Sequence, residues 1–262
     1  MTTTRLQSLL RELQQQASQT PELGSIPLLI DDVHCGQLSP RAVEVFTRQK
    51  PSFLVDGQCR LATGPTFSTD LAELALGLYE QGCIPKWRDE LLDVWCGNNV
   101  VGAIERGAVR PLGLLTRAVH LNAWSTRGEL WVARRALNKP TDPGMWDTLV
   151  GGLVGHREPD DLALVRETQE EAGLSEADIV GRGPIRSIYR MQRRVNEGFQ
   201  YEEVLTSDCV LADDAAPQNQ DGEVMDIVCL PVADIEAMLF DGAFTLEASI
   251  VITESLLNRP AR

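Results

Sequence analysis

Carboxylate side chains are crowded into one short stretch of the chain, GGLVGHREPDDLALVRETQEEAGL, which spans residues 151–174. Within it, Glu167, Glu170 and Glu171 stand three and four residues apart. Carboxylate oxygens are hard ligands that suit Mg²⁺ or Mn²⁺, and Mg²⁺ commonly bridges protein carboxylates to phosphate groups. The stretch therefore predicts a divalent metal site that acts on a phosphorylated molecule. The plainer alternative is a solvated acidic face of a surface helix.

A helix must hold these side chains. Pro159 suits the first turn of a helix and Gly173 suits its C-terminal stop, so a helix is predicted over residues 160–172. At one hundred degrees per residue the three glutamates fall within one arc. Three other positions point the opposite way and are predicted to enter the core: Leu162, Val165 and Ala172. Like charges at this spacing destabilise a helix by a few tenths of a kcal/mol per pair, and a bound cation would offset that repulsion.

The wider spacing is more specific than the acidic run. Gly152 is followed after five residues by Glu158 and after seven more by the run RETQEEAGL, which ends at Leu174. This is the pattern GX5EX7REUXEEXGU, where U is a bulky apolar residue, and by it the chain resembles the Nudix family. Seven fixed positions coincide by chance on the order of once in 10⁸ starts. Thr168, at the first U position, is the one departure, and it affects packing beneath the helix rather than a metal-binding group.

The resemblance implies a role for each residue of the motif. It implies that Mg²⁺ or Mn²⁺ is held by three side chains and a backbone carbonyl: Glu167, Glu170, Glu171 and Gly151. Arg166 and Glu158 would brace the loop before the helix and orient the glutamates. The implied reaction is hydrolysis of a diphosphate linked to some other group, so the partner is a small-molecule diphosphate.

Similarity extends beyond the motif to the two-domain Nudix hydrolases related to thiamine pyrophosphokinase. It is carried by IDDVHCGQL, IPKWRDELLDVW, KPTDPGMWDTLVGGL, GFQYEEVLTSDCVL and the QNQDGEV segment. This resemblance implies a substrate of the thiamine diphosphate class, including its oxidised analogues, which is cleaved to the monophosphate.

Several residues outside the motif are candidates for the same site. Glu223 in DGEV is the preferred source of a further ligand or base, with Glu202 as the other candidate, and an exposed carboxylate is the alternative for each. Lys139 could meet a phosphate oxygen. Trp146 and Trp124 could stack on the substrate, although buried tryptophans usually belong to the core. No catalytic role is predicted for His120 or His156.

Three other functions remain open. The chain could hydrolyse a nucleoside diphosphate linked to another group, such as ADP-ribose, or bind a ligand without turnover. KPTDPGMWDTLV also resembles a segment of isopentenyl diphosphate isomerases, which place a cysteine shortly after the tryptophan. No cysteine occurs at residues 147–151, and the intact motif favours hydrolysis.

The elements around the motif predict an α/β fold in two domains. Residues 1–112 mix helix-like and strand-like segments and predict a smaller α+β domain. Residues 113–262 alternate strands and helices, and the resemblance implies an α/β/α sandwich with a mixed sheet. The first domain has no cluster of metal ligands and no nucleophile paired with a base, so it is predicted to shape the substrate pocket without taking part in the chemistry.

Charge and cysteine content limit the classes of partner and site that the chain could have. With 38 acidic against 24 basic residues, the chain has a formal net charge of −14 and would repel nucleic acids and anionic membranes. The six cysteines lie far apart without a CxxC pair, so they suggest neither a zinc site nor a disulfide framework. The N-terminal segment lacks the apolar core of a signal peptide, and a cytoplasmic protein is expected, with a homodimer left open.

Overall fold

The computed structural model describes residues 3–139, 141–220 and 222–259. Its N-terminal part contains a four-stranded sheet of order β2-β1-β4-β3 and a separate hairpin of β5 and β6. The bounds are β1 (Ile26–Ile30), β2 (Val33–Leu38), β3 (Leu54–Val55), β4 (Gln58–Leu61), β5 (Leu91–Cys96) and β6 (Asn99–Glu105). Helices α2 (Pro40–Gln49) and α3 (Phe67–Glu80) accompany them.

One apolar core holds this N-terminal part together. Its buried side chains come from residues 28–114, with Phe46, Leu71 and Leu78 among the largest. Leu153, from the C-terminal part, packs against the same core. The N-terminal part is therefore an α+β region with its own core, in contact with the segment that leads into the acidic helix.

The C-terminal part is built on a seven-stranded mixed sheet. Strands β11 (Arg186–Val195), β12 (Gly198–Val210), β7 (Leu115–Trp124), β8 (Leu130–Arg135) and β13 (Val224–Leu230) lie in that order. Strand β10 (Val150–Leu153) pairs with β7, and β9 (Trp146–Thr148) pairs with β8. The β12–β7 pair is parallel and the other pairs are antiparallel.

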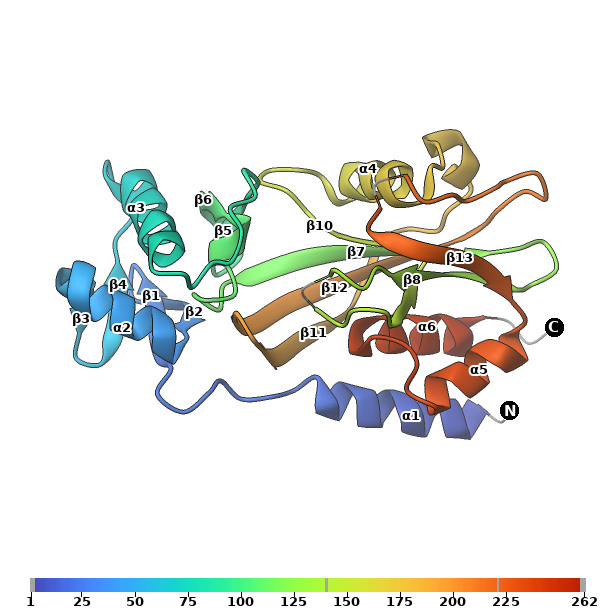
Figure 1. The fold of residues 1–262 in the computed structure, drawn as a ribbon, viewed down its shortest axis with the longest axis horizontal. Helices are drawn as coiled ribbons and strands as arrows, with labels where there is room; N and C mark the ends of the chain where they lie inside the picture. The colour runs from blue at the N-terminus through green and yellow to red at the C-terminus, as the bar shows by residue number, and fades with distance from the viewer. Residues whose placement is uncertain (1–2, 140, 221, 260–262) are drawn as a thin grey trace.

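Helices cover both faces of this sheet (Figure 1). Helix α4 (Asp160–Ala172) lies on one side, and α5 (Val232–Phe240) and α6 (Leu246–Asn258) lie on the other. Helix α1 (Thr3–Gln16) packs against α6, so the first helix of the chain contacts the C-terminal part. None of the helices in the described ranges combines the length and the apolar character that a bilayer crossing requires.

The predicted fold class is confirmed: an α/β chain with a mixed sheet between helices, preceded by an α+β region. The division near residue 112 stays a prediction, and α1 packs across it.

Helix α4 has the bounds that the sequence predicts, but its orientation differs. Gly173 ends it with φ of +65°, a conformation that favours glycine. Leu162 is 57% exposed, so the prediction that it enters the core is wrong, whereas Ala172 is buried as predicted. The buried side chains are Ala163, Leu164, Thr168, Glu171 and Ala172. The helix packs on β10 and β7 with part of its glutamate arc turned inward, which leaves Leu162 on the outside.

Thr168, the departure from the motif, is accommodated within the helix. Its side chain is fully buried, and its Oγ1 donates a hydrogen bond of 2.6 Å to the carbonyl of Leu164. The hydroxyl that replaces an apolar group therefore has a partner, and no buried polar atom is left unpaired at this position.

Candidate active site

The acidic face of α4 lies directly against two glycines of β10. Glu171 Oε2 accepts a hydrogen bond of 2.9 Å from the backbone N–H of Gly151. A Cβ added to Gly152 would stand 1.9 Å from Cδ of Glu167, so only glycine lets the strand approach that carboxylate. The glycine pair thus sets the distance between the strand and the helix.

Burial dominates the electrostatics of these two glutamates. The side chain of Glu171 is almost fully enclosed, and burial raises its pKa to about 8. Burial also raises the pKa of Glu167, against the opposing charge of Arg166. A carboxylate in such surroundings is costly unless a positive charge neutralises it.

Arg166 joins the loop before α4 to the glutamates. Its Nε donates to Glu158 Oε1 and its Nη2 to Glu158 Oε2, each at 2.9 Å, and Nη2 also donates to the carbonyl of Leu153 at 3.1 Å. Hydrogen bonding to Arg166 holds the pKa of Glu158 below its usual range. Nη1 donates to Glu167 Oε1 at 2.6 Å and to Glu170 Oε2 at 3.2 Å. One guanidinium therefore fixes three of the carboxylates predicted for the site.

The donor set fits Mg²⁺ or Mn²⁺. Within the described ranges, no three His, Cys, Asp or Glu side chains already converge on one point. Nη1 of Arg166 instead bridges Glu167 and Glu170, which shows that this pair is arranged around a positive charge. Glu170 is half exposed and open to solvent, and Glu171 supplies a buried oxygen beside the Gly151 backbone. These are hard oxygen donors of the kind that either ion prefers.

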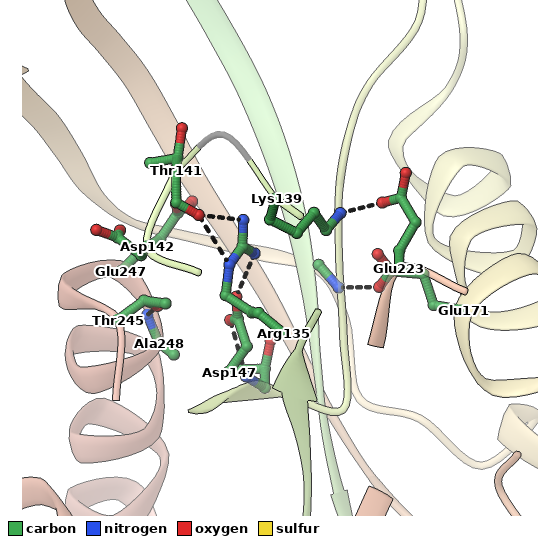
Figure 2. A network of polar contacts seen from close by, with 12 residues as sticks. Arg135, Lys139, Thr141, Asp142, Asp147, Glu171, Glu223, Thr245, Glu247 and Ala248 are labelled. Carbon is green, nitrogen blue, oxygen red and sulfur yellow. Dashed lines mark hydrogen bonds and ion pairs between the residues drawn. The ribbon is translucent and has the colours of Figure 1, made fainter. Parts of the chain in front are cut away.

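Lys139 and Glu223 reach the same region from other parts of the chain (Figure 2). Lys139 follows β8, Glu223 precedes β13, and their side chains form an ion pair. Burial alone would raise the pKa of Glu223, but the charge of Lys139 holds it below its ordinary value. Lys139 also lies near enough to Glu171 for its charge to act on that carboxyl. The fold therefore brings both predicted residues beside the glutamates of α4.

The two tryptophans lie in different surroundings. Trp146 is half-buried in β9, with the guanidinium carbon of Arg134 5.8 Å from its ring centroid. Trp124 is 2% exposed at the end of β7, packs in the core beside α5 and α6, and is covered by Arg259 at 3.6 Å. Trp124 occupies a core position and presents no open face for a substrate ring to stack on.

Glu202 belongs to a buried polar network on the α6 side of the sheet. It accepts hydrogen bonds from Thr116 Oγ1 at 2.7 Å and from Gln200 Nε2 at 2.5 Å, and burial raises its pKa to about 7. His120 Nε2 lies 2.8 Å from Glu247 Oε1 in the same region. Burial alone would lower the pKa of His120, but Glu247 holds it above the ordinary value.

The partners in this network could not be predicted from the sequence. His120 and Glu247 are 127 positions apart, and no local pattern marks them as a pair. His120 also stands opposite Gly151 in the β7–β10 register, with its Nδ1 3.0 Å from Thr148 Oγ1. The network therefore reaches the glycine pair from beneath the sheet.

Comparison with known proteins gives one family. Residues 114–248 match the NUDIX domain. The chain is similar to two Arabidopsis thaliana proteins named Nudix hydrolase 20, chloroplastic, and Nudix hydrolase 24, chloroplastic, each with 33% identity. The matches cover 71% and 68% of this chain, but only 51% and 50% of those relatives, so the chain spans about half their length. Among solved structures it is similar to DR0079 from Deinococcus radiodurans, with 21% identity, a TM-score of 0.48, and coverage of 65% of this chain and 100% of that one.

Proposed function

The chain belongs to the Nudix family, and on this premise we propose that it is a metal-dependent hydrolase of small-molecule diphosphates. The observation that carries the proposal is the contact between α4 and β10, where Glu167 and Glu171 lie against Gly152 and Gly151. That contact holds buried carboxylate oxygens next to the backbone of two glycines, and hard oxygen donors of this kind suit a divalent cation.

Each residue has a task in this proposal. Glu167, Glu170 and Glu171, with the Gly151 carbonyl, would hold Mg²⁺ or Mn²⁺. The bound metal supplies neutralisation of the diphosphate charge and acidifies water for attack on phosphorus. Glu158, in the loop before α4, and Arg166, on α4 itself, would orient the glutamates.

The ion pair of Lys139 and Glu223 offers two further groups. A lysine ammonium is a compact charge that suits a phosphate oxygen. In this proposal Lys139 meets a phosphate oxygen, and Glu223, held beside it by the ion pair, accepts a proton from water or joins the metal ligands. Its lowered pKa keeps it ionised near neutral pH, as either role requires.

Thiamine diphosphate or an oxidised analogue is the proposed substrate, with the monophosphate as product. Two features support it: the similarity of the chain to the thiamine-pyrophosphokinase-related group, and the net charge of −14, which suits a substrate with a cationic ring. Trp146 is the tryptophan of the predicted pair that remains available to such a ring, since Trp124 is buried.

The test is a comparison of kcat/KM values in the presence of Mg²⁺. Thiamine diphosphate and its oxidised analogues are expected to exceed ADP-ribose, nucleoside diphosphate sugars and dinucleotide polyphosphates. A tenfold preference for ADP-ribose or a dinucleotide, about 1.4 kcal/mol of transition-state discrimination, would move the substrate to the nucleotide class. Isomerised isopentenyl diphosphate as the product, or ligand binding without turnover against the whole panel, would contradict hydrolysis itself.

A further inference from the structure

The N-terminal part is hydrogen-bonded to the loop that precedes α4. In this loop, residues 154–158, the backbone N–H of His156 donates to the carbonyl of Leu91 in β5 at 2.8 Å. His156 Nδ1 and the backbone N–H of Arg157 both donate to Asp93 Oδ1, at 2.7 and 3.0 Å. One carboxylate of β5 therefore receives two hydrogen bonds from consecutive loop residues.

The same loop contains a residue with an unusual backbone conformation. Arg157 has φ of +55°, in the left-handed region that residues with a side chain seldom adopt. Such a conformation persists only when its surroundings hold it in place. The bond from the Arg157 N–H to Asp93 fixes this peptide, and Asp93 itself is largely enclosed, with a side chain 12% exposed.

The next residue connects the loop to the glutamates. Glu158 accepts a hydrogen bond of 2.9 Å from the N–H of Gly155 and receives two bonds from Arg166. Arg166 in turn contacts Glu167 and Glu170. Hydrogen bonds from β5 to residues 156 and 157, the peptide bond from Arg157 to Glu158, and the hydrogen bonds between Glu158 and Arg166 thus connect the N-terminal part to the acidic face of α4.

We propose that Asp93 is a positioning residue, through which the N-terminal part holds the loop so that Glu158 and Arg166 present the α4 glutamates to a divalent metal. The inference rests on the proposed function for the identity of the site. On this inference, the N-terminal part contributes to metal binding although it supplies no group to the reaction. Partners that orient metal ligands in this way typically change metal affinity or activity by about 10- to 100-fold when they are removed.

The test uses the full chain with Asp93→Ala and Asp93→Asn. Glu73→Ala is the matched control, because it also removes a carboxylate from an ion pair of the N-terminal part, with Lys50, but on α3. Mn²⁺ affinity is measured by calorimetry on the metal-free proteins, together with their melting temperatures, kcat and KM. Asp93→Ala is expected to raise the Kd for Mn²⁺ by about tenfold or more and to lower kcat with little change in KM. Asp93→Asn, which keeps an acceptor for the Arg157 N–H, should restore most of the affinity.

A merely structural contact would behave differently. It would lower the melting temperature of Asp93→Ala and leave the Mn²⁺ affinity of the folded protein at the wild-type value, and that result would overturn the inference. His156→Ala serves if Asp93→Ala does not fold, because this side chain is partly exposed and its loss leaves the backbone bond to Leu91 intact. It is expected to weaken Mn²⁺ binding, and wild-type Mn²⁺ affinity in His156→Ala would also overturn the inference.

Failure of the proposed function can be told apart from failure of this inference. Weakened Mn²⁺ binding in Asp93→Ala, in a protein that cleaves no diphosphate, would support the positioning role and contradict the hydrolase. Efficient hydrolysis by the wild type, with unchanged Mn²⁺ affinity and kcat in Asp93→Ala, would support the hydrolase and contradict the positioning role.

Discussion

The carboxylate of Glu171 is hydrogen-bonded to the backbone N–H of Gly151 at 2.9 Å, which ties the last turn of α4 to strand β10. This bond places a buried acid beside the backbone of a central sheet. Because a single amide N–H does not neutralise a carboxylate, burial at this position favours a proton or a cation on Glu171.

The first prediction concerns pH in the metal-free protein. Burial raises the pKa of Glu171 from its ordinary value of 4.5 to about 8, so between these values the folded state holds a proton that the unfolded state has released. The stabilising contribution is fully present below pH 4.5 and is lost as pH rises through 8. Melting temperatures of the metal-free wild type should therefore fall between pH 5 and 8, and Glu171→Gln should flatten that slope. An identical slope in both proteins would contradict the assigned burial effect.

The second prediction concerns the approach of the strand to the helix. Gly152→Ala would place a methyl group 1.9 Å from Glu167 Cδ, so the strand or the carboxylate must shift. We expect kcat to fall by about tenfold or more and the melting temperature to decrease. Gly181→Ala is the control, because a Cβ there meets nothing within 4 Å. Equal activity in the two variants would show that the close approach is unimportant.

The third prediction concerns the shape of the Arg166 guanidinium. Arg166→Lys keeps the charge, but one ammonium cannot reach Glu158, Glu167 and the Leu153 carbonyl together. Steady-state assays should show kcat lowered by about tenfold or more. Arg182→Lys is the control, because Arg182 pairs with Asp161, an exposed acidic residue of α4. If both substitutions had the same small effect, the planar group would have no special role.

The fourth prediction concerns Lys139. Lys139→Gln removes the ammonium that pairs with Glu223 and acts on Glu171. If Lys139 binds a phosphate oxygen, KM for the diphosphate should rise by about tenfold, while kcat changes less, because the contact exists before and during the reaction. Initial rates over a range of substrate concentrations separate the two constants. A fall in kcat at constant KM would assign the lysine to the chemical step instead.

Local signals explain what the sequence predicted well. The bounds of α4 follow from Pro159 and Gly173, whose backbone preferences act within their own turns. The glutamates of the motif, whose role as metal ligands stays a prediction, are also close in sequence, so one helix and one strand end place them in the same region. No long-range information was needed for either prediction.

Contacts between distant segments account for what was missed. The Leu162 side chain is exposed because the acidic side of α4 packs against the glycines of β10. Helical periodicity does not predict a tertiary contact of this kind. Asp93 and His156 are 63 positions apart, and nothing in β5 marks that aspartate as a partner of the loop. A core position was the more common alternative for Trp124, but its partners, α5, α6 and Arg259, come much later in the chain and are not marked by any local pattern.

The central proposal is that the α4 glutamates hold the metal that supports diphosphate cleavage. Its most direct test follows the best substrate of the kcat/KM comparison by ³¹P NMR, with Mg²⁺, for the wild type and Glu170→Gln. Glu170 is half exposed, so the amide leaves the fold intact while removing charge from the metal site. We predict that the wild type cleaves the substrate and that cleavage stops when a chelator removes Mg²⁺. The rate in Glu170→Gln should fall by about 100-fold or more. Cleavage by Glu170→Gln at the wild-type rate, or undiminished cleavage after chelation, would contradict the claim.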